Sequence, residues 1–368
     1  MDPSLKFKIA ISFIPGVGSV IAKRLISYTG DIEAIFKEKK HNLLKIPGIG
    51  DFIAEKISHS DALIKAEKEM EFIERNRISV VFYLDDAYPC KLKQCADAPV
   101  VLYVKGSGSL HAEKCISVVG TRKPSSLGID NCIRIINDLA VRHPGLLVVS
   151  GLAFGVDITA HKAAMKAGLS TIAVLGHGLQ MIYPAAHKKV AEDMCLQGAL
   201  LSEFPSQCVF DRSNFVKRNR IIAGMTEATL VIESGERGGA LITAELANAY
   251  NKDVFALPGR TTDTVSKGCN KLIKSNKAAL VEEAADIEYL LGWDNVHNQK
   301  ENRQLEMFVE LNEREKQLVD LLQEEKMSID VICSRMQQPP SVVFPLLLNL
   351  EFAGIVKSMP GKQYMLCR

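Results

Sequence analysis

The sequence lacks several features that would place it at once in a class of protein. Lysine and arginine total 45 against 43 acidic residues, so no global charge excess indicates nucleic-acid or membrane binding. No apolar run approaches the roughly 20 residues of a membrane span. Residues 1–16 carry no signal-peptide pattern. We therefore expect a cytoplasmic protein with no membrane partner, whose binding sites depend on local clustering of charge.

Motifs for metals and nucleotide cofactors are also missing. The nine cysteines form no CxxC pair, which argues against a structural zinc site and a disulfide framework. The first strand-to-helix loop, Gly120 to Gly128, contains neither GxGxxG nor a P-loop lysine. We predict no metal and no cofactor.

The central part of the chain alternates apolar runs with helix-period segments. The runs are continuous rather than alternating, which is typical of strands buried on both faces of a parallel sheet. They lie at 115–119, 146–150, 171–175, 199–202, 228–232 and 254–257, after two strand-like runs at 78–84 and 100–104. The pattern predicts an α/β fold, an extended Rossmann-like, doubly wound, mostly parallel sheet over 70–292.

An internal repeat precedes this domain. IPGVGSVIAKRL at 14–25 recurs as IPGIGDFIAEKI at 46–57. A Pro-Gly-x-Gly turn before a helix points free amides outward, and the pattern resembles a tandem helix-hairpin-helix (SAM-like) domain over 1–64. Such pairs also serve as packing modules. If one copy binds DNA we expect the first, with Gly16, Gly18, Lys23 and Arg24.

The end of the chain has the order of a winged helix. A polar stretch at 294–304 predicts a linker over 293–305, and 306–368 contains three helical segments and a hairpin. The third helix, roughly 341–353, has no lysine or arginine, and 306–368 has seven basic and nine acidic residues. Because DNA binding needs phosphate neutralisation, we expect this module to be a protein-contact or autoregulatory surface.

Polar loops follow the predicted strands. Ligands of open α/β sheets bind at the carboxyl ends of the strands, so these loops are the expected site. The first offers a helix N-terminus with two cations and hydroxyl donors, through Gly120, Thr121, Arg122, Lys123 and Ser125. The second begins at Gly151. Its Asp157 and His161 lie four residues apart, which we interpret as an intrahelical pair or cap rather than as catalytic.

The densest local charge is DRSNFVKRNRIIAGM at 211–225. Four cations face one acid, which predicts phosphate binding by Arg212, Asn214, Lys217, Arg218, Asn219 and Arg220. Helical spacing places Lys217 and Arg220 on one side, with Arg218 offset. Phe215 offers a face for a base or a core anchor. Later loops add Gly238 and Gly239 at the same sheet edge, near Arg237.

These blocks together resemble the DNA-processing protein A family (DprA, also called Smf). The matching pieces include VVGTRKPSSLG, SGLAFGVDITAHKAAM, NFVKRNRIIAGMTEATLVIES, GGALITAELA and GCNKLI, and the likeness covers essentially the whole chain. The resemblance implies a dimeric protein that binds single-stranded DNA. It also implies that the protein loads RecA onto incoming DNA during natural transformation, without enzymatic activity.

The family's binding residues transfer onto matching positions. Its Gly-Thr-Arg loop falls on Gly120, Thr121 and Arg122, its basic residue before Asn-Phe on Arg212, and its Arg-Asn-Arg block on Arg218, Asn219 and Arg220. Two positions depart from the pattern: Phe154 stands where relatives often have a basic residue, and Gln180 where they often have an aspartate.

Two other classes of function remain open. A nucleotide hydrolase resembling lysine-decarboxylase-like phosphoribohydrolases would use Gly238, Gly239 and Glu245, although the Gly-Thr pair of that loop is missing. A double-stranded-DNA regulator would act through the winged helix, against which the uncharged third helix counts.

Overall fold

The chain folds into two units, Met1–Leu291 and Gly292–Arg368, which we describe separately. The computed structural model describes residues 4–293, 312–322, 326–353, 355–359 and 363–366. From residue 294 onward, the predicted linker lies outside these ranges. No helix within them is long and apolar enough to cross a membrane.

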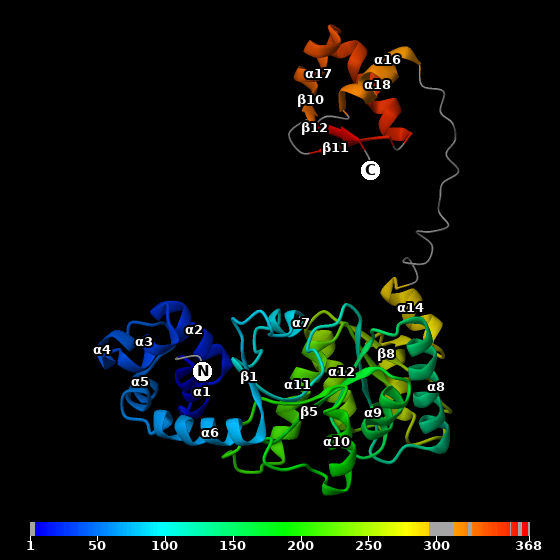
Figure 1. Cartoon of the computed structure of the whole chain (residues 1–368). Helices are drawn as coiled ribbons and strands as arrows, with labels where there is room; N and C mark the ends of the chain where they lie inside the picture. Colours follow the sequence, from blue (N-terminus) through cyan, green and yellow to red (C-terminus); the bar gives the residue numbers. More distant parts are fainter. Residues whose placement is uncertain (1–3, 294–311, 323–325, 354, 360–362, 367–368) are drawn as a thin grey trace. The chain divides into compact units, whose positions relative to one another are not determined.

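The first unit begins with a helical head (blue in Figure 1). Its helices are α1 (Leu5–Ala10), η1 (Ile11–Phe13), α2 (Ser19–Thr29), α3 (Ile32–Lys37), α4 (Lys40–Leu43) and α5 (Asp51–Ser58). The two repeated turns place Gly16 and Gly48 at φ of 83° and 82°, a region that side chains with a Cβ disfavour. The repeat therefore forms the predicted pair of turn-and-helix motifs.

The head shares an apolar core with the sheet domain. Helix α6 (Ala62–Asn76) leads from one to the other. Buried Ile9, Leu25 and Ile35 of the head belong to the same cluster as Val101 and Tyr103 of the sheet. The carboxylate of Glu69 accepts hydrogen bonds from the Ser206 amide and hydroxyl, at 2.8 and 2.6 Å. Apolar packing and hydrogen bonds thus join the head to the sheet domain.

The sheet has nine strands in the order β1-β2-β6-β5-β4-β3-β7-β8-β9. They are β1 (Ser79–Phe82), β2 (Val101–Gly106), β3 (Cys115–Val119), β4 (Leu147–Ser150), β5 (Ser170–Leu175), β6 (Ala199–Ser202), β7 (Ala228–Val231), β8 (Asp253–Ala256) and β9 (Ala279–Leu280). The strands from β3 onward pair in parallel, whereas β2 pairs antiparallel with both β1 and β6. The mostly parallel sheet is confirmed, and its six central strands lie within one residue of the predicted runs.

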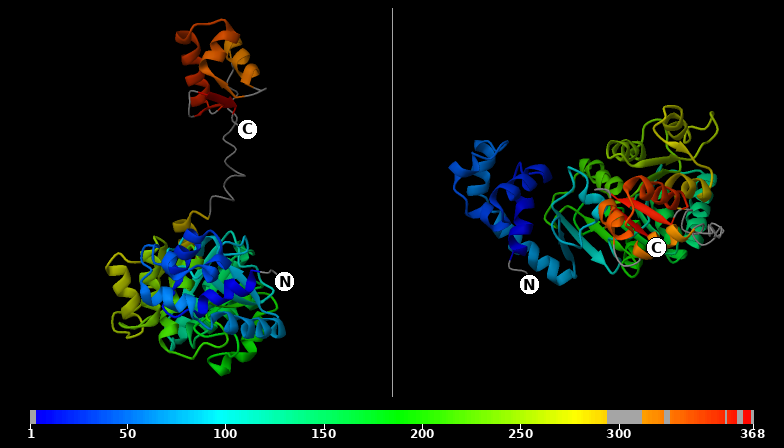
Figure 2. Two further views of the ribbon diagram at one scale, coloured as in Figure 1. Left: turned by 90° about the vertical axis from the view of Figure 1, so that its left-hand side faces the viewer. Right: turned by 90° about the horizontal axis from the view of Figure 1, so that it is seen from above.

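Helices cover both faces of the sheet. The larger core cluster joins the strands to α7 (Cys90–Lys93), α11 (Ser213–Met225), α12 (Gly239–Ala249) and α13 (Lys267–Lys274). A second cluster joins them to α9 (Val156–Lys166) and α10 (Lys188–Met194), and α9 contacts α8 (Ser126–Arg142). Helix α14 (Ala284–Leu291) packs on α8. The right-hand view of Figure 2 shows the blue head at the cyan edge of the sheet and yellow segments at the opposite edge.

The chain reverses its direction across the sheet beside β3. Strands β4, β5 and β6 follow on one side of β3, and β7, β8 and β9 on the other. Loops leaving β3 and β7 therefore diverge at their carboxyl ends, and such a switch point is where open α/β sheets bind ligands.

The second unit is a winged helix, as predicted. Helices α16 (Glu313–Leu322), α17 (Ile329–Met336) and α18 (Pro340–Phe352) pack with a sheet of order β10-β12-β11, which consists of β10 (Met327–Ser328), β11 (Val356–Met359) and β12 (Gln363–Leu366). Leu318, Ile332, Val343 and Leu347 lie in its core.

Candidate nucleic-acid interface

A cleft of about 460 Å³ opens at the switch point between β3 and β7, and we call it the switch-point cleft. The loops after β3 and β7 and one side of α11 form its walls. It brings together seven of the predicted binding residues: Gly120, Thr121, Arg122, Arg218, Asn219, Gly238 and Gly239. Among these residues, Arg122 is exposed and carries a positive charge. Arg237, in the loop before α12, is a second exposed cation that lines the cleft.

Close packing fixes the loop that carries Arg122. A Cβ on Gly120 would lie 2.4 Å from the Val156 Cγ2 atom, so a larger residue would displace α9. The Thr121 amide donates to the Glu233 carbonyl at 2.7 Å, and the Val156 amide donates to the Thr121 carbonyl at 3.2 Å. Backbone contacts from two neighbouring loops thus hold Arg122 in place.

The N-terminus of α8 is occupied by a carboxylate of the chain itself. Glu233 is buried and accepts hydrogen bonds from the Ser125 amide, at 2.8 Å, and from the Ser125 hydroxyl. The same hydroxyl accepts from the Gly128 amide at 3.0 Å. This corrects the expectation that Ser125 and the α8 amides lie open to a phosphate, because Glu233 already supplies the negative charge that a helix N-terminus favours.

The N-terminus of α12, unlike that of α8, faces the switch-point cleft. Its N-cap, Gly238, provides no side-chain cap, and Gly238 and Gly239 are both exposed in the switch-point cleft. No atom lies within 4 Å of the position that a Cβ on Gly239 would occupy. A helix of eleven residues therefore presents its positive end to the cleft beside Arg237.

Arg218 forms the floor of the cleft rather than a free contact. Only 4% of the residue is exposed, and its Nη1 donates to the Gly151 carbonyl at 2.8 Å and to the Val174 carbonyl. A Cβ on Gly151 would lie 2.6 Å from the guanidinium, so the glycine makes room for it. Burial lowers the pKa of Arg218 to about 10, which leaves the group charged at neutral pH. The expectation of a freely exposed Arg218 is corrected: it ties together the ends of β4 and β5 and charges the cleft.

Asp157 and His161 do not pair with each other. Asp157 accepts from the amides of Gly151 and Ala153 at 3.2 and 3.4 Å, and burial raises its pKa. His161 Nδ1 lies 2.8 Å from the Thr171 hydroxyl, and burial lowers the pKa of His161 to about 3. The predicted intrahelical pair is therefore wrong, whereas Asp157 does bind the amides that precede α9. Within the described ranges, no group of three or more His, Cys, Asp or Glu residues could hold a metal ion.

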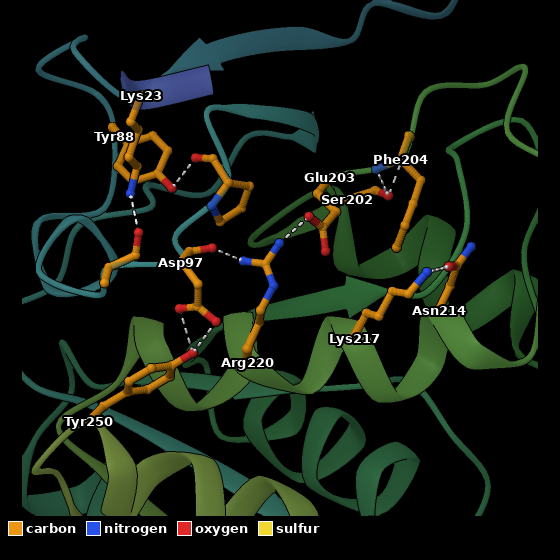
Figure 3. A network of polar contacts seen from close by, with 12 residues as sticks. Lys23, Tyr88, Asp97, Ser202, Glu203, Phe204, Asn214, Lys217, Arg220 and Tyr250 are labelled. Carbon is orange, nitrogen blue, oxygen red and sulfur yellow. Dashed lines mark hydrogen bonds and ion pairs between the residues drawn. The ribbon is translucent and has the colours of Figure 1, made fainter. Parts of the chain in front are cut away.

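Arg220 points to the opposite side of α11, toward the head. It donates to the Asp97 carbonyl at 2.6 Å and forms an ion pair with Glu203, as Figure 3 shows. The Tyr250 hydroxyl donates to the Asp97 carboxylate at 2.7 Å. Arg220 and Arg218 thus lie in different environments, in line with the predicted offset of Arg218, and Arg220, predicted to bind phosphate, is already paired within the domain.

The remaining cations at the start of α11 are exposed. Lys217 lies on the same side of the helix as Arg220, as the spacing predicts, and its Nζ contacts the Asn214 side-chain oxygen at 3.3 Å. Arg212 lines a shallow surface hollow formed by residues 208–212 and Asn214. Asn214 and Asn219 are both buried, and Asn219 donates to the Gly239 carbonyl at 3.4 Å. Asn219 thus contacts the backbone at the start of α12, while Asn214 contacts the side chains of Cys208 and Lys217; DNA binding by either asparagine, or by Lys123, remains a prediction.

The two cations predicted to bind at the first turn of the head, Lys23 and Arg24, donate to backbone carbonyls. Lys23 Nζ donates to the carbonyls of Cys95 and Ala96 at 3.4 and 3.2 Å, and Arg24 Nη1 donates to the Pro47 carbonyl at 2.7 Å. Gly16 packs against the Phe52 ring, whereas Gly18 at the start of α2 has no such neighbour. This corrects the expectation that Lys23 and Arg24 are free to bind a phosphate at the first turn.

Three residues at the carboxyl edge of the sheet, Glu233, Tyr183 and Phe210, were not among the predicted site residues. Glu233 follows β7 directly, and its contact with Ser125 joins residues 108 positions apart, for which no local signal exists. Tyr183 and Phe210 follow β5 and β6 in loops at the carboxyl edge of the sheet. Aromatic residues in loops at that edge were the available signal.

The fold and the cleft define a three-module protein with a helix-hairpin-helix head, a doubly wound sheet with a cationic switch-point cleft, and a winged helix. Comparison with known families finds the same three modules. Residues 79–292 match the DNA recombination-mediator protein A model, 309–362 the DprA winged helix domain, and 7–58 the SAM-like helix-hairpin-helix tandem. The chain belongs to the DNA-processing protein A (DprA/Smf) family, as the sequence predicts.

Relatives cover the chain to different extents. Protein Smf of Synechocystis is 31% identical over 97% of both chains, and DNA processing protein DprA of Streptococcus pneumoniae is 40% identical over 55% of this chain and 71% of its own. The crystal structure of the S. pneumoniae protein aligns with a TM-score of 0.67 at 32% identity, covering 77% of this chain and 96% of that one. A DNA processing protein A from Helicobacter pylori, described for its single-stranded-DNA-binding mode, aligns with a TM-score of 0.53 at 26% identity over 59% and 97%.

Proposed function

We propose that this protein binds single-stranded DNA at the switch-point cleft with little sequence preference. The observation that carries the proposal is the meeting of exposed Arg122 and Arg237 with the uncapped N-terminus of α12. Arginine forks and backbone amides recognise phosphate oxygens, which every nucleotide has, and need no metal. The description of the H. pylori relative supports a single-stranded ligand.

The electrostatics of the cleft favour an anion despite the carboxylates in its walls. Asp157 is buried beneath Arg218 and accepts two backbone amides, while Glu233 is turned toward α8. Lys123 follows Arg122 in the loop after β3 and Arg212 precedes α11, and both are exposed. A single strand that follows these cations would have its phosphates neutralised along its length.

The wider biological role that we propose follows from the family to which the chain belongs. We propose that the bound strand is incoming DNA in natural transformation, that the protein protects it and loads RecA onto it, and that it acts in the cytoplasm as a homodimer formed through the sheet domain. Support comes from the relatives named for DNA processing.

We propose a binding function rather than catalysis. The hydrolase alternative requires Glu245 beside Gly238 and Gly239, yet Glu245 does not line the cleft and pairs with Lys277 at 3.6 Å. Incubation with nucleoside monophosphates tests this directly, since release of free base would establish a hydrolase.

The winged helix has the surface of a protein-contact module. Helix α18 carries no lysine or arginine, and exposed Phe344, Leu348 and Phe352 recur every fourth residue along it. An apolar stripe of this kind does not neutralise phosphates, which counts against a double-stranded-DNA regulator.

A binding titration at several salt concentrations tests the proposal. Each neutralised phosphate of a single strand contributes about 0.7 to the log–log slope, so the four cations Arg122, Arg237, Lys123 and Arg212 predict a slope of about −3. Single-stranded oligonucleotides should bind more tightly than the same sequence as a duplex. A salt-independent affinity, or tighter binding of the duplex, would contradict the proposal.

A further inference from the structure

Three aromatic side chains form a cluster at the edge of the switch-point cleft. Tyr183, Phe210 and Phe215 come from the loop after β5, the loop after β6 and the first turn of α11. Their ring centroids lie 5.2 Å apart for Tyr183 and Phe210, 5.5 Å for Tyr183 and Phe215, and 5.6 Å for Phe210 and Phe215. We call these three residues the aromatic platform.

Phe215 packs against buried residues and supports the platform, whereas Tyr183 and Phe210 are partly exposed to solvent. Phe215 packs against Gly176, where a Cβ would lie 2.8 Å from its ring, and against the buried His177. Burial lowers the pKa of His177, whose Nδ1 donates to the Gly178 carbonyl and whose Nε2 accepts from the Tyr183 amide, so the base of the platform is uncharged at neutral pH. Tyr183 and Phe210 remain 44% and 39% exposed.

Two aromatic rings thus remain partly exposed above a buried support. Apolar Val209 and Val216 flank them and are themselves 83% and 48% exposed. A contiguous apolar surface rimmed by polar residues marks a binding site more often than an accident of packing.

The position of the platform points to its occupant. Phe215 lines the switch-point cleft together with Arg122, and Phe210 lines the surface hollow together with Arg212. The platform therefore connects two phosphate-binding regions, so that a strand reaching from Arg122 to Arg212 passes over it. Cations that follow a backbone and aromatic rings that face its bases are the combination found in proteins that bind single strands without sequence preference.

We propose that the exposed faces of Tyr183 and Phe210 stack with unpaired bases of single-stranded DNA whose phosphates lie on Arg122 and Arg212. The inference rests on the proposed function and adds the element that selects single over double strands, because bases in a duplex have no free face for stacking. It assigns Tyr183 and Phe210 as binding residues, although neither stands in the charged block of α11.

The test uses the full chain and an oligonucleotide carrying 2-aminopurine, whose fluorescence reports stacking. Phe210→Ser removes a ring from an exposed loop, and Phe210→Tyr keeps it. Tyr289→Ser, on α14, is the matched control, since Tyr289 is 78% exposed and lines neither the cleft nor the hollow. Affinity is measured at several salt concentrations for each variant.

We expect Phe210→Ser to weaken binding about tenfold and the double variant with Tyr183→Leu to weaken it further. The salt slope should not change, because no phosphate contact is lost. The 2-aminopurine signal should become that of an unstacked base, whereas Phe210→Tyr and Tyr289→Ser should match the parent chain.

Three results would overturn the proposal in distinguishable ways. If the parent chain binds single strands and Phe210→Ser binds equally well with an unchanged 2-aminopurine signal, the platform is not a stacking surface, and the proposed function stands. If sedimentation instead shows that Phe210→Ser alters the oligomeric state while DNA binding is normal, the occupant is a second copy of the chain. If the parent chain binds no single strand, both proposals fail together.

Discussion

The head and the sheet domain both carry glycine turns at helix N-termini with cations nearby, yet they use these cations differently. In the head, Lys23 and Arg24 donate to backbone carbonyls of the chain itself. In the sheet domain, Arg122 and Arg237 remain exposed in the switch-point cleft. A cation beside a helix N-terminus is therefore available to a ligand only when the surrounding fold has not already given it an acceptor.

The same contrast holds within α11. Arg218 and Arg220 are two residues apart, but Arg218 is buried on carbonyls at the ends of β4 and β5, and Arg220 pairs with Glu203 near the head. Lys217, between Asn214 and Arg218, is exposed. Although Lys217 and Arg220 share a side of α11, only Arg220 reaches Glu203 and the Asp97 carbonyl, so the acceptors within reach decide whether a cation pairs within the domain or faces solvent.

The largest effect is expected when the buried cation of the cleft is removed. Arg218→Ala should lower the free energy of unfolding by about 3–5 kcal/mol, because two carbonyls lose their donor and buried Asp157 loses its neighbouring cation. Lys217→Ala, the exposed neighbour, should change stability by less than about 0.5 kcal/mol. Urea denaturation followed by circular dichroism measures both, and equal midpoints would show that Arg218 is not a structural residue.

Acid should act on the sheet domain through His161. Burial holds the pKa of His161 at about 3, whereas an unfolded histidine titrates near 6.5. As the pH falls, His161 takes up a proton in the unfolded chain before it does so in the folded chain. The free energy of unfolding is therefore at its full value above pH 6.5 and decreases below it, by about 1.4 kcal/mol per pH unit.

The variant His161→Gln isolates this effect. It should keep a hydrogen bond to Thr171 without a titrating group, so its unfolding free energy should fall less steeply between pH 6.5 and 5 than that of the parent chain. If the unfolding free energies of the two proteins fall equally steeply with pH, the acid sensitivity does not come from His161.

Removing the exposed cation of the cleft should affect binding without affecting folding. Arg122→Ala should weaken single-strand binding by about 1–3 kcal/mol, uniformly across sequences. Arg122→Lys should restore part of the loss, since a point charge cannot reproduce the two-pronged contact with phosphate. Melting temperature and affinity are measured on one preparation, and a stability loss with normal affinity would remove Arg122 from the site.

The smallest effect is expected in the head. Arg24→Ala removes one partly exposed hydrogen bond to the Pro47 carbonyl and should cost about 0.5–1.5 kcal/mol of stability. Affinity for single-stranded DNA should remain that of the parent chain. Weaker DNA binding by a folded Arg24→Ala protein would show that the head takes part after all.

Much of the fold could be predicted because its strands are buried on both faces. Runs such as CISVV and LLVVS are mostly apolar without alternation and mark β3 and β4 directly. The antiparallel pairing of β2 with β6 was not predictable, since it joins Tyr103 to Ser202 across a long stretch of chain and depends on the packing of the whole sheet edge.

The candidate site was only partly predictable, for a related reason. Arg122 is placed by its position after a buried strand, which the sequence shows. The engagement of Ser125 by Glu233 and of Arg220 by Glu203 depends on partners that approach only in the folded chain. Charge along a sequence therefore indicates where cations gather, and tertiary contacts decide which of them remain free.

The central claim is that DNA phosphates bind at the switch-point cleft and not at the turns of the head. The most direct measurement compares the salt dependence of single-strand affinity for the parent chain, Arg122→Ala and Arg24→Ala on one oligonucleotide. The account predicts that Arg122→Ala lowers the magnitude of the log–log slope by about 0.7, while Arg24→Ala leaves it unchanged. The reverse pattern, with the slope reduced by Arg24→Ala and unaffected by Arg122→Ala, would contradict it.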